Sequence, residues 1–381
     1  MAQIIASDIV KPSSPTPNSS KTHTLSCLDQ ASPPVYINLI FFHENHQSKQ
    51  REEISQRLKQ SLSETLTIFY PLAGRIKQNS FIDCNDAGAE FVEALIHTRL
   101  SQFAENPKIE ELEHLVPAAF SSATDDPILS VKTSYFDCGG VAIAVCFPHK
   151  IGDISSFATF MNAWATAFRG EASGIIRASF DLAIRFPPLE MLVSGLRTGI
   201  TEEKLVTRRL VFDKDKVERI RKLEASRSEV KDPSRVEAVS AFLWRSFIEA
   251  HKQCAGGVAW FPAAHMVSLR RRGAPQVADH ALGNCFTFAA AVVSADEDGD
   301  GDMLVSRLRA GIRTVDEDYV EAISEEEFMR ELLNGLGDVF TKENCVLRVG
   351  FRMGKTGYAW INVCDDQFFS LIQANFNTLL N

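Results

Sequence analysis

The chain has 381 residues, 45% of them hydrophobic, and a formal net charge of −9 at pH 7. This length exceeds what one hydrophobic core usually holds, so we expect two domains. The acidic balance argues against nucleic acid as a partner, and no apolar stretch is long enough to span a bilayer. The eight cysteines form no Cys-x-x-Cys pair, which favours a reduced, cytoplasmic protein.

The first half of the chain mixes short apolar runs with helical periodicity. Runs rich in Val, Ile and Phe predict strands, and apolar residues every three or four positions predict helices. The link Asn85-Asp86-Ala87-Gly88 between two apolar segments predicts a hairpin. In chain order we predict a strand at 35–42, a helix at 50–69, a hairpin of 80–84 with 90–94, a strand at 140–147 and a helix near 156–169.

The second half repeats this alternation after a segment of mixed polarity. Residues 171–205 contain Pro187-Pro188 and are expected to form a crossover between domains 1–170 and 206–381. Ser234 is a suitable N-cap for a helix. The predicted elements are a strand at 206–212, helices at 217–225 and 236–251, strands at 263–269 and 285–293, a helical stretch, and final strands with a short helix. Such alternation is typical of α/β or α+β layering.

The strand at 140–147 runs directly into His149-Lys150-Ile151-Gly152-Asp153. Histidine exchanges its proton near neutral pH, so His149 at a strand end, with Asp153 four residues later, is a candidate general base. Alternatively, a histidine at the edge of the core often has a structural role alone, in which it hydrogen-bonds the backbone. The pentapeptide alone leaves both interpretations open.

Three other motifs are weaker. Residues 296–301 fit the first half of an EF-hand loop, but Arg307 stands where the bidentate Glu is needed, so we expect no metal. Residues 350–356 resemble a phosphate-binding loop with a spacer one residue too short, so we expect no nucleotide there. The run Arg270-Arg271-Arg272 is either a solvated turn or an anchor for an anionic ligand.

Further motifs surround His149 in a characteristic order. They include Leu28-Asp29-Gln30, Tyr70-Pro71-Leu72-Ala73-Gly74-Arg75, Phe136-Asp137-Cys138-Gly139-Gly140, Ser234-Arg235-Val236-Glu237-Ala238 and Leu282-Gly283-Asn284. Over nearly the whole chain this order resembles the BAHD family of plant CoA-dependent acyltransferases, and within it the enzymes of alkaloid pathways.

The resemblance implies a fold and a reaction. The fold is two similar domains of mixed sheet plus helices, like chloramphenicol acetyltransferase, with a channel between them. In the reaction His149 deprotonates a hydroxyl of an indole alkaloid or similar plant metabolite as it attacks an acyl-CoA, expected to be acetyl-CoA. The resemblance also implies a cytoplasmic monomer that binds these small molecules, with no permanently bound cofactor, no metal and no membrane partner.

The resemblance assigns roles to other residues as well. It implies that Asp153 is structural and pairs with Arg270, and that Ser234 and Arg235 contact CoA. It places Gly283 and Asn284 in a core motif of the second domain.

The chain also departs from the family pattern. It lacks the Asp-Phe-Gly-Trp-Gly run of the family, and we expect that segment to be missing between about 337 and 344. Three accounts stay open: an active enzyme with a remodelled channel, a catalytically impaired relative that binds ligands, or a splice or gene-model product.

Overall fold

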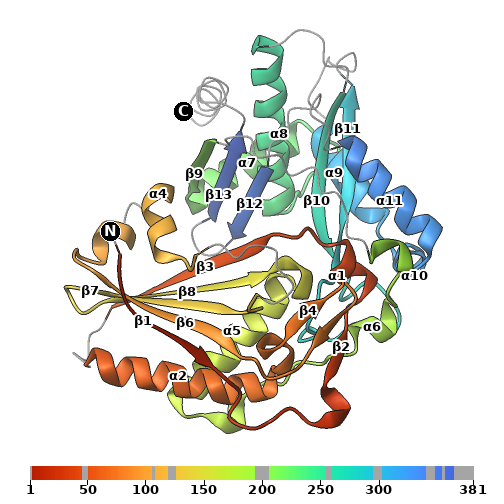
Figure 1. Ribbon diagram of the computed structural model, residues 1–381. Helices are drawn as coiled ribbons and strands as arrows, with labels where there is room; N and C mark the ends of the chain where they lie inside the picture. The colour runs from red at the N-terminus through yellow and green to blue at the C-terminus, as the bar shows by residue number, and fades with distance from the viewer. Residues whose placement is uncertain are drawn as a thin grey trace. The chain divides into compact units, whose positions relative to one another are not determined.

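A computed structural model gives the fold of the chain (Figure 1). It describes residues 2–44, 50–104, 108–118, 126–193, 206–254, 260–294, 303–339, 348–353 and 357–363. The chain divides into two compact units, the first of Met1–Thr198 with Pro275–Phe286 and the second of Gly199–Ala274 with Thr287–Asn381. The first unit thus takes a short segment from the second half of the chain. The predicted domain ranges, 1–170 and 206–381, stay a prediction.

The first unit is built on a five-stranded mixed sheet (Figure 1). Its strands β6 (Ala89–Ile96) and β7 (Ser130–Phe136) are parallel, and the other neighbouring strands are antiparallel. Helices α2 (Arg51–Ile68) and α5 (Ile154–Arg169) pack against each other and on one face of the sheet. The strand order is β1 (Gln3–Val10), β6 (Ala89–Ile96), β7 (Ser130–Phe136), β8 (Val141–Pro148) and β3 (Tyr36–His43).

Burial explains why the sequence forms these elements. Every residue of β7 is buried, and β8 is buried at all but one position, as expected for central strands covered on both faces. On α2, Leu58, Leu62 and Leu66 recur every four residues and point into the core beneath the sheet. The predicted strands at 35–42 and 140–147 and the helices at 50–69 and 156–169 are therefore confirmed.

The predicted hairpin of 80–84 with 90–94 is wrong. The first segment forms β5 (Phe81–Asp83), which pairs with β2 (Thr22–Thr24) and β4 (Arg75–Lys77) in a separate sheet, whereas the second lies in β6. Between them the Asp86 carboxylate accepts hydrogen bonds from Thr16 and Lys21, which ties the link to the N-terminal segment. The chain therefore changes sheet where a tight turn was expected.

Short helices complete the first unit. Their bounds are α1 (Cys27–Ala31), α3 (Ser101–Ala104), α4 (Ile109–Leu112), α6 (Leu182–Arg185) and the 3₁₀ helices η1 (Asn18–Ser20), η2 (Tyr70–Ala73), η3 (Glu113–Leu115), η4 (His149–Ile151), η5 (Ala172–Gly174) and η6 (Glu190–Leu192).

In the second unit, helices α7 (Lys214–Ser226), α8 (Arg235–Cys254) and α9 (Leu304–Arg313) pack together, and the described residues also form two small sheets. Apolar residues of α7, α8 and α9, among them Ile220, Phe242 and Leu308, form its core. Its strands are β9 (Val206–Phe212), β10 (Trp260–Ser268), β11 (Phe286–Ser294), β12 (Arg348–Met353) and β13 (Gly357–Val363). Its helices are α7 (Lys214–Ser226), α8 (Arg235–Cys254), α9 (Leu304–Arg313), α10 (Glu317–Ala322) and α11 (Glu326–Val339).

The second unit confirms most of the predicted elements. Strand β9 starts and ends where expected, and β12, β13 and β9 form one antiparallel sheet in that order.

Residues 350–353 lie inside β12, so they do not form a phosphate-binding loop. The acidic run 296–301 and most of the interval 337–344 lie outside the described residues. Within the described ranges, no helix is long and apolar enough to cross a membrane.

Candidate active site

His149 stands where β8 leaves the sheet and begins the 3₁₀ helix η4. Its backbone N–H donates to Val35 O at 2.8 Å, and its half-buried ring lies 5.7 Å from the ring of Phe286, centroid to centroid. Gly152 closes the turn, and a Cβ there would lie 2.7 Å from Ser156 Cβ at the start of α5. The turn is therefore tightly packed, which fixes the direction of the imidazole.

The imidazole is held by Asn284. His149 Nδ1 lies 3.0 Å from Asn284 Oδ1, and Asn284 Nδ2 donates to the backbone carbonyl of His149 at 2.7 Å. An amide oxygen can only accept, so Nδ1 carries a hydrogen in this arrangement. In the neutral imidazole the lone pair is then on Nε2, the form that a general base requires.

Asn284 is in turn held by Asp29. The fully buried Asn284 donates to Asp29 Oδ1 from its backbone N at 2.6 Å and from Nδ2 at 2.9 Å. Asp29 belongs to α1, where it forms a capping box with Ser26. A Cβ on Gly283, whose φ is +128°, would lie 2.5 Å from Leu182 Cδ2, so glycine allows the segment to approach this closely.

Asp153 is the N-cap of α5. Its Oδ1 accepts from the backbone N–H groups of Ser155 and Ser156, each at 3.0 Å. Its Oδ2 accepts from the backbone N of Cys285, also at 3.0 Å. Asp153 is 7% exposed, so its carboxylate joins the helix to the segment that carries Asn284.

Sequence reasoning missed the contact of Asn284 and Asp29 with the His149 site. The resemblance assigned Gly283 and Asn284 to a core motif of the second domain, and the structure groups both residues with the first compact unit. Their motifs were visible in the sequence. However, 255 positions separate Asp29 from Asn284, and no periodicity relates residues that far apart.

Lys150, the residue after His149, is half-buried. Its Nζ donates to the backbone carbonyls of Gln30 at 3.1 Å and Ser32 at 2.9 Å. Burial lowers the pKa of Lys150 to about 8, and the nearby Asp29 carboxylate opposes that fall. The lysine therefore ties the His149 turn to the end of α1.

Ser234 and Arg235 lie in the second unit, at the start of α8, and both are exposed. The hydroxyl of Ser234 accepts from the backbone N of Glu237 at 3.2 Å, and the backbone N of Ser234 donates to Glu237 Oε2 at 2.7 Å. This reciprocal pair is a capping box, and it confirms Ser234 as the N-cap.

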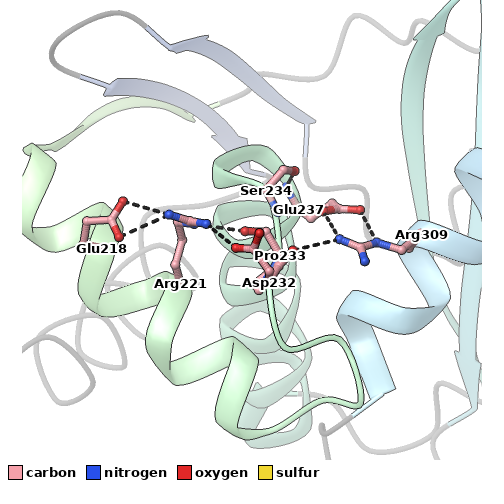
Figure 2. Close-up of polar contacts among 7 residues, drawn as sticks. All are labelled: Glu218, Arg221, Asp232, Pro233, Ser234, Glu237 and Arg309. Carbon is pink, nitrogen blue, oxygen red and sulfur yellow. Dashed lines mark hydrogen bonds and ion pairs between the residues drawn. The ribbon is translucent and has the colours of Figure 1, made fainter.

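Two arginines brace the loop before α8 from opposite sides (Figure 2). Arg309 donates to both carboxylate oxygens of Glu237 at 2.7 Å and to the backbone carbonyl of Asp232 at 3.2 Å. Arg221 donates to the carbonyl of Pro233 at 2.9 Å and to the Asp232 carboxylate at 2.6 Å. The hydrogen bonds from Arg309 lower the pKa of Glu237 to about 2.

The basic run 270–272 is not a uniformly solvated turn. Arg270 is only 4% exposed, and Arg272 donates to the carbonyl of Ile312 at 3.1 Å. Only Arg271 is exposed as a solvated turn predicts. Among the side chains that the structure describes, no group of three His, Cys, Asp or Glu residues gathers as a metal site.

The fold and the His149 site define a class of protein. A family model of the Transferase family matches residues 1–354. The chain therefore belongs to this family, the BAHD acyltransferases, and is an acyltransferase. Enzymes of this family use acyl-CoA as co-substrate.

Individual relatives are similar over most of the chain. Stemmadenine O-acetyltransferase from Catharanthus roseus is 41% identical over 84% of this chain and 77% of its own length. Vinorine synthase from Rauvolfia serpentina is 35% identical over 98% of both chains. A crystal structure of vinorine synthase superimposes with a TM-score of 0.85 at 31% sequence identity. This superposition covers 100% of this chain and 98% of the other. The TRI101 structure from F. sporotrichioides, solved with coenzyme A and T-2, shares the fold at a TM-score of 0.69 and 15% identity, covering 93% of this chain and 97% of that one.

The comparison with vinorine synthase also shows a difference in length. The alignment extends over 416 positions, whereas this chain has only 381 residues, so at least 35 of those positions have no residue in this chain. This agrees with the absence of the Asp-Phe-Gly-Trp-Gly run from the sequence.

Proposed function

We propose that this protein is an acetyl-CoA-dependent O-acetyltransferase. Its acceptor is a hydroxyl group of an alkaloid or a similar plant specialised metabolite, and His149 is the general base. The acetyl group and the acceptor class follow from the names of the relatives, several of which are alkaloid or limonoid O-acetyltransferases.

The proposed reaction needs one base and no covalent acyl-enzyme. His149 Nε2 takes the proton of the acceptor hydroxyl as its oxygen attacks the thioester carbonyl carbon. The resulting tetrahedral oxyanion collapses, the carbon–sulfur bond breaks, and the CoA thiolate takes the proton back from the imidazolium. The products are an acetyl ester and CoA-SH, so atoms and charge balance.

The observation that supports the base assignment is the hydrogen bond between His149 Nδ1 and Asn284 Oδ1 at 3.0 Å. It keeps a hydrogen on Nδ1 and so leaves Nε2 as the proton acceptor.

The remaining predicted site residues keep their proposed roles. Asp153 is structural, since its carboxylate caps α5 and binds the Cys285 backbone. Its pairing with Arg270 stays a prediction, because the two residues belong to different compact units. Ser234 and Arg235 bind CoA, with the exposed guanidinium of Arg235 suited to a phosphate group.

One observation favours a second candidate, a BAHD-fold protein that binds ligands without turnover. At least 35 aligned positions of vinorine synthase lack a counterpart here. Residues missing in that number can include side chains that turnover requires. Sequencing the transcript across residues 337–344 tests whether the loss belongs to the natural protein.

The experiment for both candidates is thiol release from acetyl-CoA with a panel of hydroxylated alkaloids. We compare the wild type with His149→Ala and, as a matched control, His97→Ala, whose imidazole is exposed and pairs with Asp137. Loss of a general base lowers the rate by about 10²- to 10⁴-fold. Turnover by the wild type that survives in His149→Ala refutes the base assignment, and ligand binding with no turnover favours the second candidate.

A further inference from the structure

Asp29 is a buried carboxylate that takes no direct part in the proposed reaction. In space, one residue, Asn284, lies between it and the His149 imidazole. Asp29 is 2% exposed, and its carboxylate is the acceptor in each of its four hydrogen bonds. Oδ1 accepts the two N–H groups of Asn284, and Oδ2 accepts the backbone N and the hydroxyl of Ser26 at 3.0 and 2.6 Å. This set of donors favours the ionised, acceptor-only form.

The Asn284 amide has two orientations, and its neighbours select one. In the observed orientation, Nδ2 donates to Asp29 and to the carbonyl of His149 while Oδ1 faces the imidazole. If the amide were turned over, Oδ1 would face the Asp29 carboxylate and the His149 carbonyl. All three groups are hydrogen-bond acceptors, so both hydrogen bonds would be lost. The turned amide would also present an N–H₂ group to His149 Nδ1, which would move the imidazole proton to Nε2.

We propose that Asp29 is a positioning residue: its carboxylate holds the Asn284 amide in one orientation and thereby keeps the proton of the neutral His149 imidazole on Nδ1. This inference rests on the proposed role of His149 as the base. It adds to that role a carboxylate from the first 30 residues of the chain that acts on the imidazole through an amide rather than by direct contact.

Burial and hydrogen bonding act on the Asp29 carboxyl in opposite directions, and burial is the larger effect. Burial raises its pKa, and the hydrogen bonds from Ser26 and Asn284 oppose that rise. Lys150, whose Nζ is bound to the carbonyls of Gln30 and Ser32 on the same helix end, supplies a nearby positive charge.

The test uses Asp29→Asn in the full-length protein, because asparagine keeps the size of the side chain but not its acceptor-only character. Glu93→Gln is the matched control: it is also a buried acid in the first unit, bound by Lys59 and by Tyr135 at 3.2 Å, and it lies on β6. We expect Asp29→Asn to lower kcat by at least about tenfold through loss of the correct tautomer, with KM for acetyl-CoA changed less than about threefold. Glu93→Gln should keep the wild-type kcat.

A double-mutant cycle with Asn284→Ala shows whether Asp29 acts through the amide. If it does, Asp29→Asn should lower kcat by less than about twofold further when Asn284 is already alanine. Full additivity of the two losses, or an unchanged kcat in folded Asp29→Asn, overturns the proposal.

A second measurement does not depend on turnover. In the wild type labelled with ¹⁵N-histidine, the His149 signals, identified by their loss in His149→Ala, should show a protonated Nδ1 and an unprotonated Nε2. The opposite tautomer overturns the inference about Asp29 even if acetyl transfer is found. If no acetyl transfer is found, the proposed function fails, and the tautomer in wild type and Asp29→Asn still decides the role of Asp29.

Discussion

Neutralising Glu237 should weaken both the second unit and the proposed CoA site. The carboxylate accepts two hydrogen bonds from Arg309 and one from the backbone of Ser234, and its side chain is 13% exposed. These bonds lower its pKa from 4.5 to about 2. Without solvent screening, a shift of that size corresponds to about 3 kcal/mol of folding free energy. The Arg309 side chain is 28% exposed, and solvent screening reduces this to about 1–2 kcal/mol. We therefore expect Glu237→Gln to lower the free energy of unfolding by that amount at pH 7.

The pH dependence has a definite sign. A carboxyl whose pKa is lower in the folded protein stabilises it above the unfolded pKa of about 4.5, and that stabilisation is lost as the pH falls towards about 2. Urea unfolding between pH 7 and pH 3 should show a smaller loss of stability for Glu237→Gln than for the wild type. The control is Glu326→Gln, whose exposed pair with Arg330 in the same unit should contribute less than about 0.5 kcal/mol.

The same variant tests the proposed CoA site. Because Glu237 and Arg309 fix the turn that presents Ser234 and Arg235 (Figure 2), we expect Glu237→Gln to raise KM for acetyl-CoA more than it lowers kcat. A variant with wild-type stability and wild-type KM would refute the idea that this brace matters. Raised KM in Glu326→Gln as well would show that the effect is not specific to the turn.

Three further changes probe the two units. Burial lowers the pKa of His23 to about 4, so about 3 kcal/mol of stability should be lost as the pH falls from about 6.5 to 4, and His23→Gln should lose less in urea unfolding over that range. Gly152→Ala should cost about 1–3 kcal/mol and lower kcat, because its Cβ would lie 2.7 Å from Ser156 Cβ, and a wild-type melting temperature would contradict this. Arg245→Met should cost about 3–5 kcal/mol by leaving the buried Glu224 carboxylate unpaired, and adding Glu224→Leu should restore most of it in the same denaturation assay.

The elements that sequence could predict are those set by local patterns. Helix α2 shows Leu58, Leu62 and Leu66 at regular spacing, and β8 is a continuous apolar run, so both follow from burial of one face or two. The prediction of a hairpin at 80–94 was wrong because the link between the two segments resembles a turn. Residues far away in the sequence determine where this link lies and which strands the two segments pair with. Asp86 is held by Thr16 and Lys21, which lie 70 and 65 positions earlier. No window of sequence contains that information.

The site divides in the same way. His149 could be singled out as a candidate base, since a strand end followed by a compact turn is visible in five residues. Its partner could not, because Asn284 reaches the imidazole only after the chain returns to the first unit with residues 275–286. A base needs both a nitrogen and a group that fixes its tautomer. The motifs at Asp29 and Asn284 therefore acquire a chemical meaning only when their contact is seen, since the sequence shows the candidate base but not the hydrogen bonds that fix the tautomer of its imidazole.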